Sequence, residues 1–93
     1  MLGLAARAGK VKSGMFQTEE AIRDGSACLV IMAEDAGDNS AKTLRDKCSY
    51  YEVPLAVYGN SDALGHAIGK ENRVCAAVID SGFSVSIRKL MGD

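Results

Sequence analysis

The sequence predicts an α/β fold, a three-layer α/β/α sandwich around a small, about four-stranded mixed sheet. Segments with a helical pattern of apolar residues alternate with short strand-like segments, and the connections between them are short. Two strand-like segments, residues 28–33 (CLVIMA) and 74–79 (VCAAVI), are continuously apolar, which is typical of strands covered on both faces. A chain of 93 residues without a linker or repeat is expected to form one domain over residues 1–93.

The first half of the chain predicts two helices and two strands. They are a helix at residues 2–8, a short strand at 10–13, a helix from Met15 or Phe16 to Asp24, and a strand at 28–33. The first helix is rich in good helix formers and stops before Gly9. The second stops before Gly25, because glycine readily adopts the left-handed conformation that follows a C-cap.

The second half predicts three helices and two strands. They are a helix capped by Ser40 and running to about Tyr51, a strand at 55–58, a short helix capped by Ser61 or Asp62, a strand at 74–79, and a closing helix from Phe83 to Met91. In the first of these helices, Leu44, Cys48 and Tyr51 share one face, so we expect them in the core. The closing segment leaves an alternative, because Phe83, Val85 and Ile87 also fit a strand.

The bulk composition is that of an ordinary globular protein, with 47% hydrophobic and 25% charged residues. No apolar run approaches the length of a membrane span, and the first residues lack the apolar core of a signal peptide, so we expect a cytoplasmic protein without a membrane partner. The net charge is −1, but residues 1–14 hold three cations and no acid, whereas residues 15–40 hold six acids against Arg23 alone. A basic surface would therefore have to be assembled from separate segments.

Few residues indicate catalysis, a cofactor or a metal. The three cysteines are widely spaced and sit in apolar surroundings, which favours small hydrophobic core residues in a reduced protein over a disulfide or metal site. His66, the one histidine, is expected to be a surface or packing residue. The carboxylates of Glu34, Asp35 and Asp38 follow a predicted strand but match no ligand spacing, so a solvated turn is favoured over a cation site or an enzyme.

The start of the second helix is the strongest candidate site. Gly14 can adopt backbone angles closed to other residues, and the helix after it leaves its first N–H groups without partners. These groups carry a partial positive charge, so they can hold a phosphate of a nucleic-acid backbone. Arg7, Lys10 and Lys12 lie just upstream and add positive charge.

Six stretches in order carry a family resemblance. They are LGLAARAGK at 2–10, SG followed by a helix and a glycine at 13–25, LVIMAEDA at 29–36, DKCSYYEVPLAVYG at 46–59, LGHAIGKENRVCAAVID at 64–80 and GF at 82–83. With these, the chain closely resembles the bacterial YlxQ-type proteins. They belong to the superfamily of RNA-binding ribosomal proteins typified by the archaeal large-subunit protein "seven-Ae" and the eukaryotic large-subunit protein "L-thirty".

The resemblance implies an α/β/α sandwich that binds a kink-turn, an RNA internal loop with tandem sheared G·A pairs and a sharply bent backbone. Gly14 matches the family glycine that enters the RNA groove. The Asn–Glu pair that contacts guanine in this family is replaced by Phe16 and Gln17, and a family lysine by Glu20. Gln17 can still accept a hydrogen bond from guanine, whereas Phe16 either stacks on a base or packs in the core. The negative charge of the Glu20 carboxylate is unfavourable near a phosphate.

The loop at residues 70–73 (KENR) matches the family loop that packs on an extruded base, but it is more polar. The resemblance thus implies a non-enzymatic RNA-binding protein without cofactor, metal or small-molecule substrate, associated with ribosomal or other structured RNA. The expected contact residues are Arg7, Lys10, Lys12, Gly14, Met15, Phe16, Gln17, Glu20, Lys70, Glu71, Asn72 and Arg73. The alternative is a protein-interaction module that has lost kink-turn binding and docks on a translation factor or ribosomal protein.

Overall fold

Helices and strands alternate through residues 2–91, the part of the chain that the computed structural model describes. In chain order they are α1 (Leu2–Arg7), β1 (Val11–Ser13), α2 (Met15–Arg23), β2 (Leu29–Met32), α3 (Asp38–Tyr51), β3 (Leu55–Val57), α4 (Ser61–Ala67), β4 (Cys75–Val78) and α5 (Ser81–Leu90). The closing segment is therefore a helix, and the alternative of a strand is wrong. The elements form the α/β fold that the sequence predicts.

The four strands form one mixed sheet with the order β1-β4-β2-β3. Strand β4 runs antiparallel to both of its neighbours, whereas β2 and β3 are parallel. The two central strands, β2 and β4, are buried along their whole length, which explains their continuously apolar sequences. Strand β1 is an edge strand, and its last residue, Ser13, pairs with Ala76 near the start of β4.

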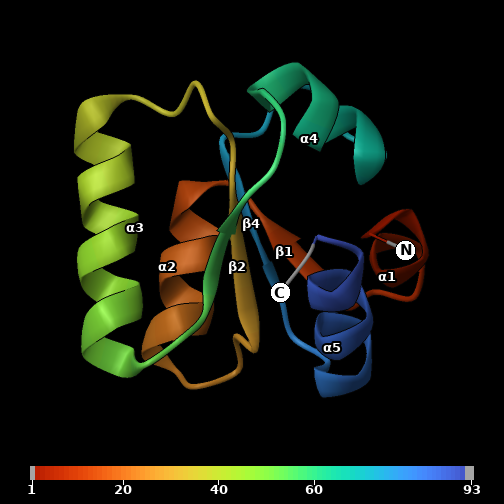
Figure 1. The fold of residues 1–93 in the computed structure, drawn as a ribbon, viewed down its shortest axis with the longest axis horizontal. Helices are drawn as coiled ribbons and strands as arrows, with labels where there is room; N and C mark the ends of the chain where they lie inside the picture. The colour runs from red at the N-terminus through yellow and green to blue at the C-terminus, as the bar shows by residue number, and fades with distance from the viewer. Residues whose placement is uncertain (1, 92–93) are drawn as a thin grey trace.

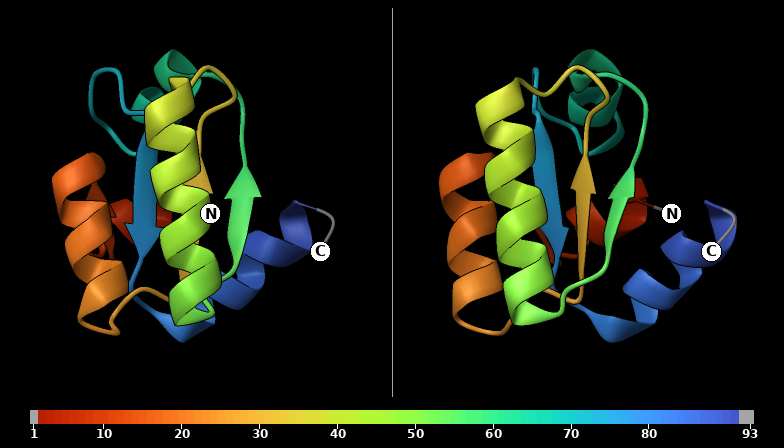
Figure 2. Two further views of the ribbon diagram at one scale, coloured as in Figure 1. Left: turned by 90° about the vertical axis from the view of Figure 1, so that its left-hand side faces the viewer. Right: turned by 60° about the vertical axis from the view of Figure 1, so that its left-hand side comes forward.

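Helices cover both faces of this sheet (Figure 1 and Figure 2). Helices α2 and α3 pack on one face, and α1, α4 and α5 lie on the other. Successive side chains of a strand point to opposite faces, so Val30 and Met32 of β2 join the core under α2 and α3, whereas Leu29 and Ile31 join the second core. The fold thus buries two apolar layers rather than one.

Helix starts differ from the sequence predictions in two places. Helix α3 begins at Asp38 after Gly37, with no side-chain cap, so Ser40 lies inside the helix. Helix α4 is capped by Asn60, whose Oδ1 accepts a hydrogen bond from the Ala63 amide at 2.8 Å. The predicted caps Ser61 and Asp62 are wrong by one or two residues, because Asn60 is itself a good capping residue and directly precedes them.

The C-terminal end of α3 also differs from the expectation. Leu44 and Cys48 are buried, but Tyr51 is 41% exposed. Its ring packs edge-on against Tyr50, with ring centroids 4.9 Å apart, instead of entering the core. The helical pattern therefore overestimates burial at this end of α3.

The cysteines are free thiols, with Cys48 and Cys75 buried in the core and Cys28 half-buried. Burial raises the pKa of Cys48 to about 11, and the nearby Cys75 adds to the rise. The pKa of Cys75 is raised as well, chiefly by burial. Both buried thiols are therefore neutral at physiological pH. Within residues 2–91, no helix combines the length and the apolar character that a membrane span requires.

Candidate nucleic-acid interface

Two segments far apart in the sequence meet at one edge of the sheet. Because β1 and β4 are antiparallel, the end of β1 lies beside the start of β4. The amide of Gly14 donates a hydrogen bond to the carbonyl of Cys75 at 3.0 Å. The start of α2 is thereby joined to the chain that enters β4. We call residues 14–17 together with residues 70–73 the docking edge.

The backbone at the start of α2 requires a glycine. Gly14 has φ 87° and ψ 161°, a combination that residues with a Cβ atom essentially never adopt. The carbonyl of Gly14 accepts the first helical hydrogen bond, from Thr18 at 3.0 Å. No side chain caps the helix, and the amides of residues 15–17 have no acceptor within the described residues. Three N–H groups are therefore open at the positive end of the helix dipole.

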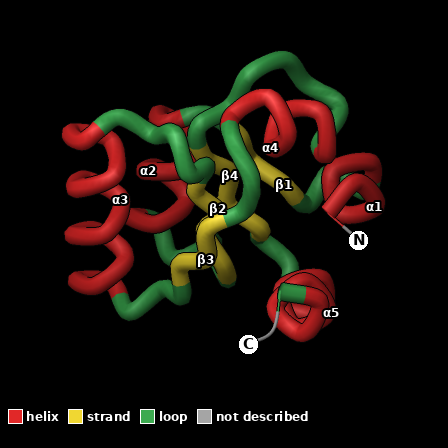
Figure 3. The backbone as a smooth tube through the Cα atoms, turned by 45° about the horizontal axis from the view of Figure 1, so that its top comes forward, coloured by secondary structure: helices red, strands yellow, loops and turns green. Residues whose placement is uncertain are grey.

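The loop at residues 70–73 is held against α4 and against β1. The Lys70 amide donates to the carbonyl of Gly65 at 2.8 Å, and the Arg73 amide donates to the carbonyl of Ser61 at 3.1 Å. The Arg73 side chain then bridges two segments, since its Nε donates to Ser13 Oγ at 3.4 Å and its Nη1 to the Asn72 carbonyl at 2.8 Å. Figure 3 shows this loop, which joins α4 to β4.

Gly65 and Asp35 contribute to positioning this loop, a part that was not assigned to them from the sequence. Gly65 is buried in α4, and a Cβ atom at this position would overlap the carbonyl of Glu71. Asp35 accepts hydrogen bonds from the amide and the hydroxyl of Ser61 at 2.7 and 2.9 Å, which anchors the start of α4. A glycine inside a helix is the one sequence signal available for Gly65, because it lowers helix stability and implies close packing.

Phe16 lies on the surface, with 74% of its side chain exposed. Core packing, one of the two interpretations that the sequence left open, is therefore wrong for this residue. Phe16 and Gln17 line one hollow of about 330 Å³ together with Lys12 and Glu20. Both side chains of the pair that replaces the family Asn–Glu are accordingly accessible to a ligand.

The side chain of Met15 packs inward. The side chain is half-buried and packs against the core under α2. Cys75 Sγ donates a hydrogen bond to the Met15 sulfur at 3.6 Å, and also contacts Thr18 Oγ1 at 3.5 Å. These contacts fix the first turn of α2 on the start of β4. A side-chain role for Met15 in ligand contact does not fit this packing.

The acidic residues of α2 lie on different parts of its surface. Glu20 is exposed on the same face as Phe16, one turn further along the helix. Glu19 points elsewhere, since its carboxylate lies 3.9 Å from the Lys47 ammonium of α3. A hydrogen bond from Ser26 lowers the pKa of Asp24 at the end of the helix, and nearby Lys12 contributes weakly. Lys12 therefore lies beside acidic groups of α2.

The other predicted cations are distributed unequally. Arg7 and Lys70 line one hollow of about 290 Å³ beside the end of β1. Lys10 precedes β1, and its carbonyl accepts a hydrogen bond from the Ile79 amide at 2.9 Å, beyond the other end of β4. At ~3.3 Å per residue, Lys10 lies about 10 Å from Ser13 along the strand. The structure thus brings Arg7 to the docking edge and leaves Lys10 away from it.

The outer surface of the loop is polar and carries both signs of charge. A hollow of about 590 Å³ is lined by Asp62, His66, Lys70, Glu71, Asn72 and Arg73. His66 is exposed there, as expected for a surface histidine. Within residues 2–91, no cluster of three or more His, Cys, Asp or Glu side chains is arranged to hold a metal ion.

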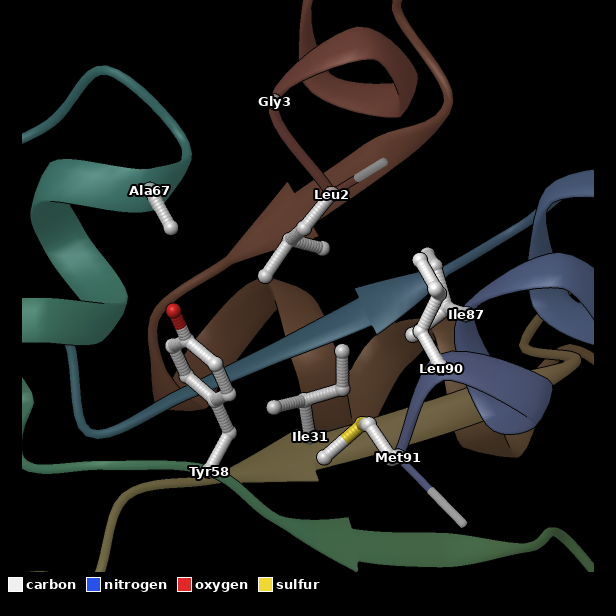
Figure 4. Close-up of a pocket in the computed structure, with 8 residues that line it drawn as sticks. All are labelled: Leu2, Gly3, Ile31, Tyr58, Ala67, Ile87, Leu90 and Met91. Carbon is white, nitrogen blue, oxygen red and sulfur yellow. The ribbon is translucent and has the colours of Figure 1, made fainter. Parts of the chain in front are cut away.

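An apolar pocket of about 270 Å³ lies in the other helical layer, away from the docking edge. Figure 4 shows its lining, with Ile31 of β2 between the helices α1, α4 and α5 and the Tyr58 ring extending toward Leu2 and Ala67. The Tyr58 hydroxyl is the one polar side-chain group among the eight lining residues. This pocket therefore offers shape and apolar contact but no acid, base or nucleophile for catalysis.

Known proteins are similar to this chain in sequence and in fold. The chain is 46% identical to the RNA-binding protein YlxQ of Bacillus subtilis (strain 168) over 91 residues, covering 98% of this chain and 91% of the relative. It is 37% identical to the RNA-binding protein YlxQ of Enterococcus faecium, covering 98% of this chain and 87% of the relative. Both alignments extend over nearly the whole chain, so they span both segments of the docking edge.

Two solved structures have the same architecture. A protein of unknown function from Bacillus halodurans C superposes with a TM-score of 0.94 at 44% identity, covering 99% of this chain and 93% of that one. The 15.5kD RNA binding protein of Giardia lamblia superposes with a TM-score of 0.82 at 24% identity, covering 98% and 78%, which is a likeness of fold alone.

The family comparison agrees with these relatives. The pattern of the Ribosomal protein L7Ae/L30e/S12e/Gadd45 family matches residues 1–87. This match spans every strand of the sheet and most of α5. The resemblance stated from the sequence motifs is confirmed, and the chain belongs to the Ribosomal protein L7Ae/L30e/S12e/Gadd45 family.

Proposed function

We propose that this chain is a non-enzymatic RNA-binding protein whose docking edge holds a bent, structured RNA of the kink-turn kind. It works in the cytoplasm in association with ribosomal or similarly folded RNA, and it needs no cofactor. The observation that carries the proposal is the hydrogen bond from Gly14 to Cys75, because it keeps the open amides of α2 beside the loop that enters β4.

The chemistry of the docking edge suits a distorted RNA backbone. Open amides at a helix N-terminus donate hydrogen bonds to phosphate or base oxygens, and they require no side-chain charge. RNA is read where its bases are unstacked, and an exposed aromatic ring then adds about 1–3 kcal/mol of stacking per base. Phe16 offers such a ring, and Gln17 offers an amide oxygen for a guanine amino group.

The named relatives support the same conclusion. The proteins from Bacillus subtilis and Enterococcus faecium are both called RNA-binding proteins. Their sequences align with nearly the whole of this chain, so the fold that carries the docking edge is common to them.

A second candidate function rests on the surface of α2. Phe16 is 74% exposed beside the carboxylate of Glu20, and an exposed aromatic ring next to an acid is also suited to a basic protein surface. In this case the chain is an interaction module that docks on a translation factor or ribosomal protein. The same helix then faces protein instead of RNA.

A fluorescence polarisation assay tests the leading proposal. The probes are a kink-turn hairpin, a straight duplex of the same length, and total ribosomal RNA as competitor. We expect the kink-turn to bind more tightly than the duplex, and its affinity to fall with salt by just under one log–log unit per neutralised phosphate. Equal binding of hairpin and duplex, or an affinity that ignores salt, would contradict the proposal.

A further inference from the structure

Two adjoining hollows between α1 and α4 are lined by cations and by no carboxylate. The first, of about 290 Å³, is lined by Ala6, Arg7, Val11, Ser13, Ile68, Gly69 and Lys70. The second, of about 250 Å³, is lined by Gly3, Arg7, His66, Ala67, Ile68 and Gly69. They share Arg7, so we treat them as one surface, the α1–α4 groove.

The charge of this groove differs from that of the surfaces around it. The hollow on α2 contains Glu20 and Asp24, and the hollow outside the loop contains Asp62 and Glu71. In the α1–α4 groove the ionisable side chains are Arg7, Lys70 and His66 alone among the described residues. Lys70 and His66 also border the outer hollow that holds Asp62 and Glu71, so Arg7 is the one ionisable side chain of the groove that no carboxylate-lined hollow shares among the described residues.

The groove is continuous with the docking edge. Lys70 belongs to the docking edge and lines the first hollow, as does Ser13, whose hydroxyl accepts the hydrogen bond from Arg73. From there the surface leads past Arg7 to His66. A polymer that leaves the docking edge along this side therefore passes Lys70, Arg7 and His66 in hollows that no carboxylate lines.

The floor of the groove allows a close approach. Its lining includes Gly3, Ala6, Ala67 and Gly69, and a Cβ atom on Gly3 would lie 3.1 Å from the carbonyl of Ala67. Helices α1 and α4 therefore pack closely at this point and hold the groove in a fixed shape. A phosphodiester backbone has the charge that suits such a surface, since its phosphates are spaced along a flexible strand.

We propose that the α1–α4 groove binds the phosphates of the RNA strand that leaves the docking edge, a second contact that rests on the proposed function. The Arg7 guanidinium donates two hydrogen bonds to one phosphate, and the Lys70 ammonium contacts the phosphate nearer the docking edge. The His66 ring donates an N–H in either protonation state. The groove therefore adds affinity without reading sequence.

The test compares two kink-turn hairpins, one with minimal stems and one with both stems extended by a helical turn. Affinity for each is measured against salt for the unaltered chain, for Arg7→Gln and for Arg45→Gln. Arg45 is an exposed arginine of α3, in the other helical layer, so it is a control with the same change of charge. We expect the extended hairpin to bind more tightly than the minimal one.

Arg7→Gln is expected to weaken the extended hairpin roughly threefold or more and to lower its salt slope by just under one unit. Its loss with the minimal hairpin should be smaller, and Arg45→Gln should change neither. Equal affinity of the two hairpins, or an equal loss with both in Arg7→Gln, would overturn this inference and leave the docking edge intact. If neither hairpin binds, the proposed function itself is contradicted, and so is the inference about the α1–α4 groove.

Discussion

The Nε of Arg73 donates a hydrogen bond to the hydroxyl of Ser13 at 3.4 Å, although the two residues are 60 positions apart. This contact joins the loop before β4 to the residue before Gly14. The Gly14 amide makes a second connection, to the carbonyl of Cys75 at 3.0 Å. The open amides of α2 and the loop at residues 70–73 therefore form one surface rather than two independent ones.

Replacing Gly14 by alanine is expected to lower the free energy of unfolding by about 1–3 kcal/mol. The reason is its φ of 87°, because a Cβ atom strains this conformation even though nothing lies within 4 Å of it. The open amides should shift at the same time, so affinity for the kink-turn hairpin should fall. Urea unfolding and polarisation measure the two effects.

Gly37→Ala is the matched control for that change. Gly37 also precedes a helix, but its φ is −61° and nothing lies within 4 Å of an added Cβ. We expect a change within about 0.5 kcal/mol and unaltered RNA affinity. If Gly14→Ala behaved like Gly37→Ala in both assays, the special role of the α2 start would be refuted.

Gly65→Ala is expected to displace the loop at residues 70–73. The added methyl would overlap the Glu71 carbonyl, so either α4 or the loop must move, at a cost of about 1–3 kcal/mol. Amide NMR spectra should show the largest shifts in the loop, and RNA affinity should fall. A variant that folds with an unperturbed loop would show that this packing does not position the interface.

Reversing the charge of Glu20 distinguishes the RNA-binding proposal from the protein-interaction alternative. A carboxylate about 4 Å from a phosphate costs about 1 kcal/mol in water, so Glu20→Lys should strengthen RNA binding about fivefold or more. The interaction-module alternative predicts the reverse for a basic protein partner. Glu52→Lys is the control. Glu52 is an exposed residue at the C-terminal end of α3, and the same change of charge there should have little effect on RNA binding.

The buried thiol of Cys48 predicts a loss of stability at high pH. Its pKa rises from 9.0 to about 11 in the folded chain, chiefly because burial disfavours the thiolate. The unfolded chain therefore releases its proton first, and this contribution is fully present below pH 9 and lost as pH rises toward 11. Urea unfolding between pH 7 and 11 should show a shallower decline for Cys48→Ala than for Cys28→Ala, and equal declines would contradict this assignment.

The sequence predicts the architecture well because its strongest signals are local. The runs at residues 28–33 and 74–79 contain the buried strands β2 and β4, and Gly14 and Gly25 border α2 as expected. The predicted helix starts are less accurate. Helix α3 begins after Gly37, which has no side chain to mark it as a cap, and α4 is capped by Asn60 rather than by the predicted Ser61 or Asp62. The exposure of Tyr51 depends on what packs against the end of α3 in three dimensions, which no helical period encodes.

The candidate site is only partly visible in the sequence. Its open amides follow from a local rule for helix starts, but the contact of Asp35 with Ser61 joins residues 26 apart, and sequence spacing does not predict it. The same holds for the packing of Gly65 on Glu71. Lys10 illustrates the converse, since it is close to Gly14 in sequence but lies at the other end of a strand.

The most direct test of the docking edge is a titration of the isotope-labelled chain with a kink-turn hairpin, followed through its backbone amide NMR signals. We expect the largest shifts at residues 14–17 and 69–73, with smaller ones along the α1–α4 groove. Shifts concentrated on the C-terminal half of α3 and on α5, with the docking edge unchanged, would contradict the account.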